Sequence, residues 1–320
     1  MALYDELKVF SGNSNPELAN AVADYLKMPL GRIEAFKFSN DNTFVRFNEN
    51  IRQRDVFLIQ SLSYPVNDSV MELLIMIDAA RRASAGRITA VVPYYGYGRT
   101  DKKDQPRVPI TARLIADLLT TAGAERVLTM DLHAGQIQGF FSIPVDELTA
   151  LPILVGHFND MHLDSPVVVA VDIGISKRAR DFAERLNAPL AIIEKRRVAG
   201  NQDKTELLNI IGEVEGRTAI LMDDEVDTGG TMVNAAVALV NAGVKGVYAC
   251  ATHGVLSGEA TKRLQGSPIQ EFVCTDSIPV PPHKRDVRVK TVSVAPLLGE
   301  AIHRIHSGMS VGAMFENDHH

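Results

Sequence analysis

The chain alternates short apolar runs with longer stretches whose apolar residues recur at helical spacing, and this alternation restricts the possible folds more than any other feature. Most of the short runs are continuously apolar, which is typical of strands buried on both faces of a parallel sheet. The predicted strands are Val56–Gln60, Ile88–Val92, Arg126–Met130, Val167–Val171, Leu190–Ile193, Thr218–Met222, Gly246–Ala251 and Gln270–Cys274. The predicted helices are Ser69–Ala83, Ile110–Ala122, Ser176–Leu186 and Met232–Ala242. We therefore predict an α/β fold with mostly parallel sheets flanked by helices.

The length of the chain and a weak internal repeat predict two tandem domains. A chain of 320 residues exceeds the roughly 150 residues of a typical single domain. Residues 54–83 and 217–243 share a plan of arginine, apolar strand, polar loop and helix, and another strand follows each copy. We expect domains at 1–146 and 147–320, with about the last 25 residues able to pack back on the N-terminal domain.

Composition and charge exclude several classes of protein. The net charge of −6 argues against a nucleic-acid-binding surface, although it permits a local basic pocket. The N-terminus lacks the pattern of a signal peptide, and no run approaches the roughly 18 apolar residues of a membrane span. We therefore expect a cytoplasmic protein without a membrane partner. Cys250 and Cys274 lie in apolar runs and are predicted to be buried thiols.

Charged residues follow most of the predicted strands. In an open parallel sheet, ligands bind outside the carboxyl ends of the strands, so these residues are candidates for one or more sites. The mixture of acids and cations suits metal-assisted chemistry on a phosphorylated substrate, because carboxylates or an imidazole hold Mg²⁺ or sugar hydroxyls and cations neutralise phosphate oxygens. The candidates are Arg99, Asp101, Asp131, His133, Asp172, Lys195, Arg196, Arg197, Asp223, Asp224 and Asp227.

The stretch "DDEVDTGGT" (223–231) has the most specific chemistry. Thr228, Gly229, Gly230 and Thr231 precede a predicted helix, so backbone N–H groups at the positive end of the helix dipole can hold a phosphate monoester. Asp223 and Asp224 would repel that phosphate and are expected to accept hydrogen bonds from hydroxyls or to hold a metal. A phosphate end and a hydroxyl end describe a sugar phosphate; the competing interpretation is a surface turn with solvated acids.

Two further segments allow more than one interpretation. Three adjacent cations in "EKRR" (194–197) are often only solvated, but here they follow a predicted strand near anion-binding loops, and the polar segment 199–206 is predicted to be a lid. His133 in "DLHAGQ" suits either a core histidine or a metal or phosphate contact. The chain contains neither a P-loop nor a complete dinucleotide-binding glycine motif.

Seven stretches, in this order, resemble one family along nearly the whole chain. They are "NDSVMELLIMIDAARRASA", "VVPYYGYGRTDKK", "PITARLIADLL", "DLHAGQIQGFF", "AIIEKRR", "DDEVDTGGT" and "THGVLSG". The chain resembles ribose-phosphate diphosphokinases, also called phosphoribosyl-pyrophosphate synthetases. The resemblance implies two phosphoribosyltransferase-like domains, assembly into homohexamers built from dimers, and transfer of the diphosphoryl group of MgATP to the 1-hydroxyl of ribose 5-phosphate. The products are phosphoribosyl pyrophosphate and AMP, and the cofactor is Mg²⁺.

The resemblance also implies roles for individual residues. Lys195 and Arg197 match the pair that stabilises the transferring diphosphoryl group. The loop from Asp227 to Thr231 matches the phosphate-binding loop for ribose 5-phosphate, with Asp223 and Asp224 at the sugar hydroxyls. Metal positions match His133, Asp172 and Asp131. The matching ATP positions are Phe38, Asn40, Asn42, Arg99, Thr100, Asp101 and His133.

Three positions depart from the family pattern. Asn40 and Asn42 replace carboxylates in the adenine-reading loop, so the preferred nucleotide donor is left open. Ile175 replaces the second glycine after Asp172, and Val198 replaces a proline after the cations.

The first two departures motivate one alternative function, a regulatory relative that binds the active enzyme. A second alternative is a phosphoribosyltransferase, since the same phosphate loop serves that class. The N-terminal half with its own ATP-like features argues against it.

Overall fold

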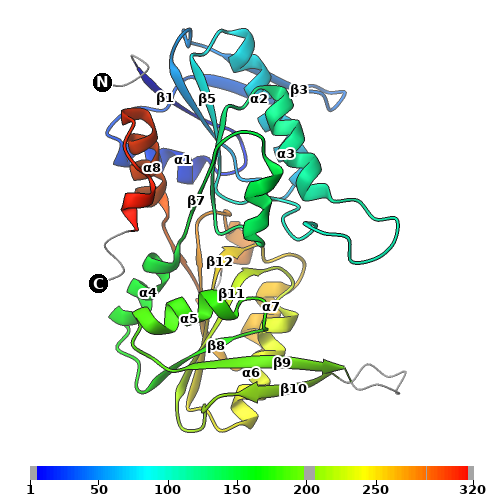
Figure 1. The fold of residues 1–320 in the computed structure, drawn as a ribbon, viewed down its shortest axis with the longest axis vertical. Helices are drawn as coiled ribbons and strands as arrows, with labels where there is room; N and C mark the ends of the chain where they lie inside the picture. The colour runs from blue at the N-terminus through cyan, green and yellow to red at the C-terminus, as the bar shows by residue number, and fades with distance from the viewer. Residues whose placement is uncertain (1–5, 198–205, 286, 316–320) are drawn as a thin grey trace. The chain divides into compact units, whose positions relative to one another are not determined.

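The computed structural model describes residues 6–197, 206–285 and 287–315, with the backbone alone at 195–197 and 206–207. The chain divides into two compact units. Unit 1 consists of the chain up to Thr149, the short segment Ser277–Pro279 and the chain from Ser293 onward. Unit 2 consists of Ala150–Asp276 and Val280–Val292. Each unit has its own sheet and its own apolar core, so each is described by itself (Figure 1).

Unit 1 is built on a five-stranded sheet in which every strand pairs in parallel with its neighbours. The order is β1-β4-β5-β6-β7, so the chain leaves and re-enters the sheet through crossovers, as in the predicted strand-helix repeat. All five residues of β4 are buried, which explains its continuously apolar sequence after Asp55. The strands are β1 (Leu7–Ser11), β4 (Asp55–Ile59), β5 (Arg87–Val92), β6 (Arg126–Met130) and β7 (Val145–Leu148).

In the described part of unit 1, four α-helices and two short 3-10 segments accompany this sheet. They are α1 (Pro16–Tyr25), α2 (Val66–Arg82), α3 (Thr111–Ala122), α8 (Ala295–Ser307), η1 (Gly135–Phe140) and η3 (Gly312–Met314). α2 and α3 pack against each other and bury the apolar faces that the helical spacing predicts, including Leu73, Met76 and Leu119.

The C-terminal helix α8 packs on α1, beside the N-terminal strand (Figure 1). The helices approach closely at Gly299, where a Cβ atom would lie 2.4 Å from the ring of Tyr25. Asp55 is fully buried at the start of β4 and accepts two hydrogen bonds from Arg87. A third contact, of 2.9 Å, joins its Oδ2 atom to Nδ1 of His306. A buried carboxylate is tolerated only with such partners, so α8 completes the polar network at this end of the sheet.

A two-stranded antiparallel hairpin, β2 (Ile33–Lys37) and β3 (Thr43–Phe47), stands apart from the main sheet of unit 1. β3 packs against α2. Neither strand contains a buried residue, and Phe36 is 44% exposed. The sequence interpretation missed this hairpin because half-exposed strands lack the continuous apolar run that identified the buried ones.

Unit 2 is built on a seven-stranded sheet of order β10-β9-β8-β11-β12-β13-β14. All neighbours pair in parallel except β10 with β9, which pair antiparallel at one edge. The strands are β8 (Pro166–Ala170), β9 (Leu190–Arg197), β10 (Glu206–Ile211), β11 (Thr218–Val226), β12 (Gly246–Gly254), β13 (Ile269–Thr275) and β14 (Val289–Val292). The accompanying helices are α4 (Leu151–Asp160), α5 (Ser176–Arg185), α6 (Gly230–Asn241), α7 (Ala260–Gln265) and the 3-10 segment η2 (Pro282–Lys284).

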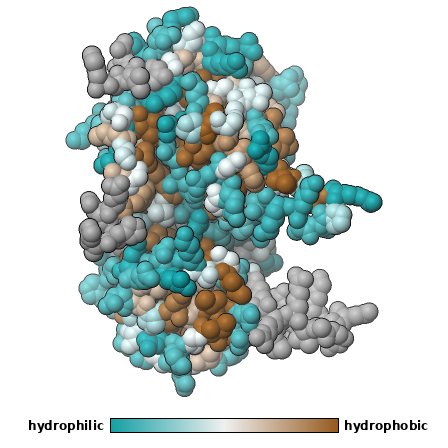
Figure 2. Space-filling view, in the orientation of Figure 1, coloured by the Kyte–Doolittle hydropathy of each residue, from teal (hydrophilic) through white to brown (hydrophobic). Residues whose placement is uncertain are grey.

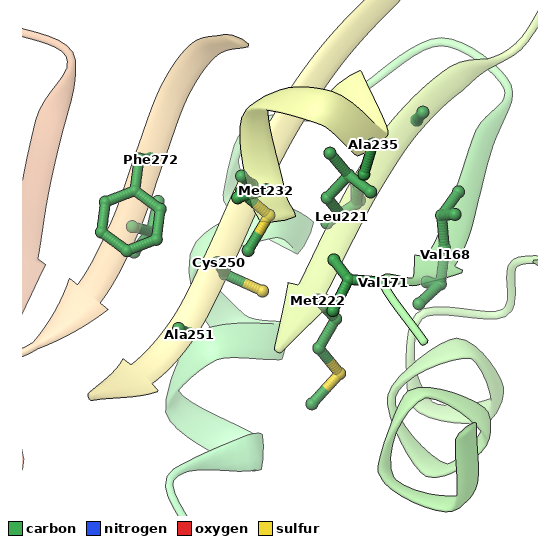
Figure 3. Close-up of a cluster of buried hydrophobic side chains, with 14 of the residues drawn as sticks. Val168, Val171, Leu221, Met222, Met232, Ala235, Cys250, Ala251 and Phe272 are labelled. Carbon is green, nitrogen blue, oxygen red and sulfur yellow. The ribbon is translucent and has the colours of Figure 1, made fainter. Parts of the chain in front are cut away.

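The core of unit 2 forms where α6 covers the central strands. Figure 3 shows Met232 and Ala235 of α6 beside Leu221 of β11 and Cys250 of β12. Cys250 and Cys274 are buried free thiols, as predicted. Burial raises the pKa of each thiol well above that of an ordinary cysteine. This apolar layer rigidly supports the carboxyl end of β11.

The predicted α/β class, with mostly parallel sheets flanked by helices, is confirmed, but the ends of β9, β11 and β12 were placed too early; β12 runs to Gly254, past its predicted end at Ala251. β9 extends to Arg197, so Lys195, Arg196 and Arg197 belong to the strand and not to the loop after it. Their backbones pair antiparallel with the edge strand β10, which the sequence interpretation did not predict. β11 extends to Val226 because its pairing with β12 continues through Glu225 and His253, so Asp223 and Asp224 also lie within a strand.

Candidate active site

Two acids occupy the carboxyl end of β11 in unit 2. Asp224 is buried, and its backbone N–H donates to Oδ1 of Asp223 at 2.9 Å. Burial raises the pKa of Asp223 to about 9, and a hydrogen bond with Asp224 and the charges of Asp224 and Asp172 act in the same direction. Removing two neighbouring carboxylates from water favours a shared proton over two negative charges. The pair is therefore ready to accept a hydrogen bond or a cation.

The loop after β11 is a glycine turn that leads directly into α6. Gly229 is the N-cap of α6 and has φ of 76°, in the left-handed region that glycine tolerates best. Among the described residues, no side chain caps this helix by a hydrogen bond, so the backbone N–H groups of its first turn suit an anion. The loop is held from outside: Ser257 Oγ donates to Asp227 Oδ1, the Ser257 N–H donates to the Asp227 carbonyl at 3.0 Å, and Arg263 donates to the Thr228 carbonyl at 3.0 Å.

Asp172, on the loop after the neighbouring strand β8, contributes a third carboxylate in unit 2. Its Oδ1 atom accepts the Ile175 N–H at 3.2 Å, which fixes the turn that leads into α5. Ile175 has φ of −88°, an ordinary value for a β-branched residue, and its side chain is buried in the core. The replacement of glycine at this position therefore requires no left-handed backbone.

In unit 1, two loops at the carboxyl ends of β5 and β6 lie side by side. A Cβ atom on Gly98 would lie 3.6 Å from Cβ of His133, which places Gly98, the residue before Arg99, beside His133. Thr100 is anchored by its hydroxyl, which donates to the Tyr97 carbonyl at 2.6 Å. The Oδ1 atom of Asp101 is buried and accepts no hydrogen bond from any residue in the described part of the chain. Buried acceptors are nearly always paired, so this atom suits a donor from a ligand or water.

The loop that carries Asp131 and His133 is held by a residue that sequence reasoning missed. Glu147 on β7 accepts the Leu132 N–H at 2.9 Å, and its other oxygen accepts Nε2 of Gln138 at 2.5 Å. Asp131 is buried and has φ of 39°, a backbone conformation that a non-glycine residue keeps only when its surroundings hold it. Glu147 had no sequence signal, because only the pairing of β6 with β7 brings it beside this loop.

The predicted adenine-reading residues lie at the tip of the β2–β3 hairpin in unit 1. Phe38 is 48% exposed and its ring contacts those of Phe36 and Phe44 at centroid distances of 5.1 and 5.6 Å. The Oδ1 atom of Asn40 accepts the Asn42 N–H at 3.2 Å, which closes the turn. Asn40 therefore has a local structural role besides any contact with a base.

The structure groups the predicted residues by unit. Unit 1 brings Arg99, Thr100 and Asp101 beside the loop of Asp131 and His133; the tip of its hairpin carries Phe38, Asn40 and Asn42. Unit 2 brings Asp172, Asp223 and Asp224 to one sheet edge, with the turn Asp227–Thr231 directly after β11. The backbones of Lys195 and Arg197 lie in β9, but their side chains, like residues 198–205 of the predicted lid and Val198, lie outside the described residues.

The fold defines a class of protein: two α/β units with mostly parallel sheets, of the phosphoribosyltransferase type, one of which carries an acid pair and a glycine turn at the end of a central strand. Residues 7–123 match the family model described as the N-terminal domain of ribose phosphate pyrophosphokinase, and residues 199–316 match that of the phosphoribosyl synthetase-associated domain. The ribose-phosphate pyrophosphokinase of Caldanaerobacter subterraneus subsp. tengcongensis is 57% identical, with 98% of this chain and 100% of the relative covered.

Other relatives agree. The ribose-phosphate pyrophosphokinase of Clostridium acetobutylicum is 54% identical over 98% of both chains. The crystal structure of phosphoribosylpyrophosphate synthetase from Mycobacterium smegmatis superposes with a TM-score of 0.90 at 42% identity, covering 95% of this chain and all of that one. The chain belongs to the ribose-phosphate pyrophosphokinase family. It is a transferase, and the predicted activity of a ribose-phosphate diphosphokinase is confirmed by these relatives.

Proposed function

We propose that the chain binds ribose 5-phosphate in unit 2 and ATP in unit 1, and that it transfers the β,γ-diphosphoryl group of ATP to the 1-hydroxyl of the sugar. The observation that carries the sugar assignment is the turn Asp227–Thr231. Its left-handed Gly229, its helix start without a side-chain cap and its Asp227 held by Ser257 form a ready cradle for a phosphate monoester. Asp223 and Asp224 then accept hydrogen bonds from the ribose hydroxyls.

The ATP assignment is supported by the two adjacent loops and the hairpin of unit 1. Arg99 supplies a positive charge for the phosphates, and the buried Oδ1 atom of Asp101 gives an acceptor for a ligand donor. The exposed ring of Phe38 offers a face on which a purine can stack. The full proposed ATP set is Phe38, Asn40, Asn42, Arg99, Thr100, Asp101 and His133.

Magnesium is the proposed cofactor, held by Asp131 and His133 in unit 1 and by Asp172 in unit 2. The described residues contain no group of three or more acidic, histidine or cysteine side chains that could by themselves hold a metal ion. The carboxylates of Asp131 and Asp172 and the imidazole of His133 fit Mg²⁺, because this ion commonly keeps several waters and binds through one or two carboxylates together with substrate phosphates. When bound, Mg²⁺ would neutralise charge on the phosphate oxygens.

The reaction then follows from positioning and charge. The 1-hydroxyl oxygen of the sugar forms a bond to the β-phosphorus while the bond from that phosphorus to the α-phosphate oxygen breaks, and AMP leaves. The hydroxyl proton is lost late in the transfer, so no strong general base is required. Lys195 and Arg197 on β9 are proposed to stabilise the negative charge on the diphosphoryl group in flight. Holding hydroxyl, phosphorus and leaving oxygen in line supplies the remaining acceleration.

We also propose self-association into a homo-oligomer, with the hexamer of the family as the expected form. Apolar side chains of unit 2 support the proposal: Ile211 at the end of β10 is 51% exposed, and Val237 and Val240 on α6 are 44% and 46% exposed. Figure 2 shows apolar surface gathered on this unit. Light scattering of the purified protein measures the assembly directly; a monomer at micromolar concentration would contradict it.

The proposed cellular location is the cytoplasm. No helix in the described portion of the chain combines the length and the apolar character that a membrane crossing requires.

The test of the activity is to mix the protein with MgATP and ribose 5-phosphate and to follow both products, AMP and phosphoribosyl pyrophosphate. GTP and CTP are run alongside, because Asn40 and Asn42 leave the donor preference open. Formation of AMP that requires the sugar supports diphosphoryl transfer. Protein that binds ribose 5-phosphate but turns over no nucleotide would instead support the regulatory role.

A further inference from the structure

A buried hydrogen-bonded network lies behind the hairpin of unit 1. Glu72 on α2 is 9% exposed and accepts three hydrogen bonds: from the Asn13 N–H at 2.6 Å, from Asn13 Nδ2 at 2.7 Å and from Gln60 Nε2 at 2.9 Å. Gln60, directly after β4, uses its Oε1 atom to accept the N–H and the hydroxyl of Ser14 at 3.1 and 2.7 Å. The network therefore fixes the loop after β1 to both α2 and β4.

Asn13 carries this network to the hairpin. The same Nδ2 group that donates to Glu72 also donates to the Ala35 carbonyl of β2 at 3.0 Å. Ala35 lies three residues before Phe38 along the chain. A second link on the hairpin is the partly exposed pair of Lys37 with Asp68, at 2.8 Å, and exposed ion pairs contribute little. The bond from Asn13 thus ties the hairpin to a buried carboxylate by a polar contact, in addition to the apolar packing of β3 on α2 and of Phe47 on buried Phe10.

The backbone of the loop supports the same conclusion. A Cβ atom on Gly12 would lie 2.2 Å from Oε1 of Gln60 and 2.9 Å from Oε1 of Glu72. Only glycine leaves space for the two polar side chains at this position, so the loop and the network are matched to each other.

We propose that Glu72 is a positioning residue for the nucleotide: through Asn13 it fixes the β2–β3 hairpin at the distance from which Phe38 meets the base. The inference rests on the proposed function, in which Phe38 stacks on ATP. Neither Glu72 nor Asn13 touches the substrate in this account. Their effect is on the affinity for ATP and on the order of the hairpin, and it leaves the ribose 5-phosphate turn of unit 2 unchanged.

Glu72→Gln tests the link with little change in shape. An amide offers one acceptor where the carboxylate offers two, so the NH₂ group introduced at this position would face the NH₂ group of Asn13. If the amide of Asn13 turned over to pair with the introduced amide, its oxygen would face the Ala35 carbonyl, and the link to the hairpin would be lost. We expect the KM for MgATP to rise about tenfold, with the KM for ribose 5-phosphate within about twofold of wild type.

Hydrogen exchange supplies a readout that does not depend on activity. Residues 33–47 should exchange faster in Glu72→Gln than in the wild-type protein, while α6 and β11 should not change. Glu34→Gln is the matched control, because it removes a carboxylate of the hairpin itself, paired at 2.8 Å with exposed Arg46, without touching the network. Asn13→Ser, at an exposed position, removes the same link and keeps the test available if Glu72→Gln does not fold.

The double variant Asn13→Asp with Glu72→Gln separates stability from positioning. The new amide can donate to the new carboxylate, which restores the pair, but the carboxylate cannot donate to the Ala35 carbonyl. We expect Tm to recover while the KM for MgATP stays high. If the two KM values, for MgATP and for ribose 5-phosphate, and kcat all return to wild-type values together with Tm, Glu72 has only a structural role and the inference fails.

Phe38→Ala distinguishes failure of the inference from failure of the proposed function. If Phe38→Ala raises the KM for MgATP and Glu72→Gln does not, the hairpin contacts the nucleotide but Glu72 does not position it. If Phe38→Ala has no effect on this KM, the proposed contact with the base is wrong and the inference falls with it.

Discussion

The β4–α2 connection of unit 1 and the β11–α6 connection of unit 2 follow the same plan of buried strand, polar loop and helix. Their polar groups differ in use: those of unit 1 bond within the fold, whereas those of unit 2 suit a ligand. In unit 1, Gln60, Ser61 and Ser69 make their hydrogen bonds inward, to Ser14, to the Ser277 carbonyl and to the Ser63 carbonyl. In unit 2, two acids stay close together at a cost in charge repulsion, and the helix begins without a side-chain cap.

The difference teaches how one architecture serves two purposes. Where a loop satisfies most of its own polar groups, it strengthens the fold and offers little to a ligand; in unit 1 the exception is the Ser63 hydroxyl, which is buried without a hydrogen-bond partner among the described residues. Where it keeps two acids close together and out of water, as in unit 2, it sacrifices stability and offers groups that suit a ligand. The comparison predicts that substitutions in unit 2 change function first, and that substitutions in the unit 1 loop change stability first.

The largest expected effect comes from Lys195→Ala on β9 of unit 2. Removing the cation that we propose to stabilise charge in the transition state should lower kcat on the order of a thousandfold, with an unchanged fold. Product formation under saturating substrates measures the loss, and circular dichroism checks the fold. A variant that keeps most of its turnover would remove Lys195 from the mechanism.

Asp227→Ala should be next in size. The substitution removes the side chain that Ser257 holds and loosens the phosphate turn, so the affinity for ribose 5-phosphate should fall about a hundredfold. Isothermal titration with the sugar phosphate alone measures this affinity. Unchanged binding would refute the assignment of the turn, and the KM for MgATP, which belongs to unit 1, serves as the internal control.

Asp223→Asn should stabilise the protein while it weakens binding of the sugar. Because folding raises the pKa of Asp223 to about 9, the folded state keeps a proton that the unfolded chain loses near pH 4, and the contribution of Asp223 to stability falls as pH rises through that interval. An asparagine has no such dependence. The gain in Tm of the variant over wild type should therefore grow between pH 5 and pH 8.

A gain in Tm that is the same at both values of pH would show that Asp223 is not protonated in the folded protein. The comparison between the two loops would then lose its electrostatic basis, although the anion-binding turn would still stand.

The smallest effect is expected for Ser61→Ala in unit 1. The buried hydroxyl donates to the Ser277 carbonyl at 2.5 Å, and its loss should lower the free energy of unfolding by about 1 to 2 kcal/mol. Chemical denaturation measures the change. The affinity for ribose 5-phosphate should not change; a weaker affinity would mean that the unit 1 loop is not purely structural.

The predictable part of this molecule is the part that periodicity and local chemistry encode. Buried strands such as β4 are continuously apolar after their first residue and could be predicted from that pattern. The turn at Gly229 could also be predicted, because glycine, acids and a helix start occur within nine residues. The ends of β9 and β11 were not, because their last residues are charged and are kept in the sheet by pairing with neighbours.

The supporting residues were also beyond local reasoning. Glu147 reaches the loop of Asp131 and His133 only through the pairing of β6 and β7, and Glu72 lies 59 positions from Asn13 in the chain. Sequence patterns therefore located groups suited to touch substrate, whereas groups that hold them in place required the three-dimensional contacts.

The return of α8 to unit 1 has a consequence for how the protein is made. The Asp55 carboxylate, an early part of the chain, obtains its contact with His306 only after nearly the whole polypeptide has left the ribosome. Unit 2 lies between these segments in sequence, so it can finish folding while unit 1 still waits for its last helix. A premature stop codon near position 293 would remove α8 and would therefore destabilise unit 1, at the N-terminal end of the chain, before unit 2.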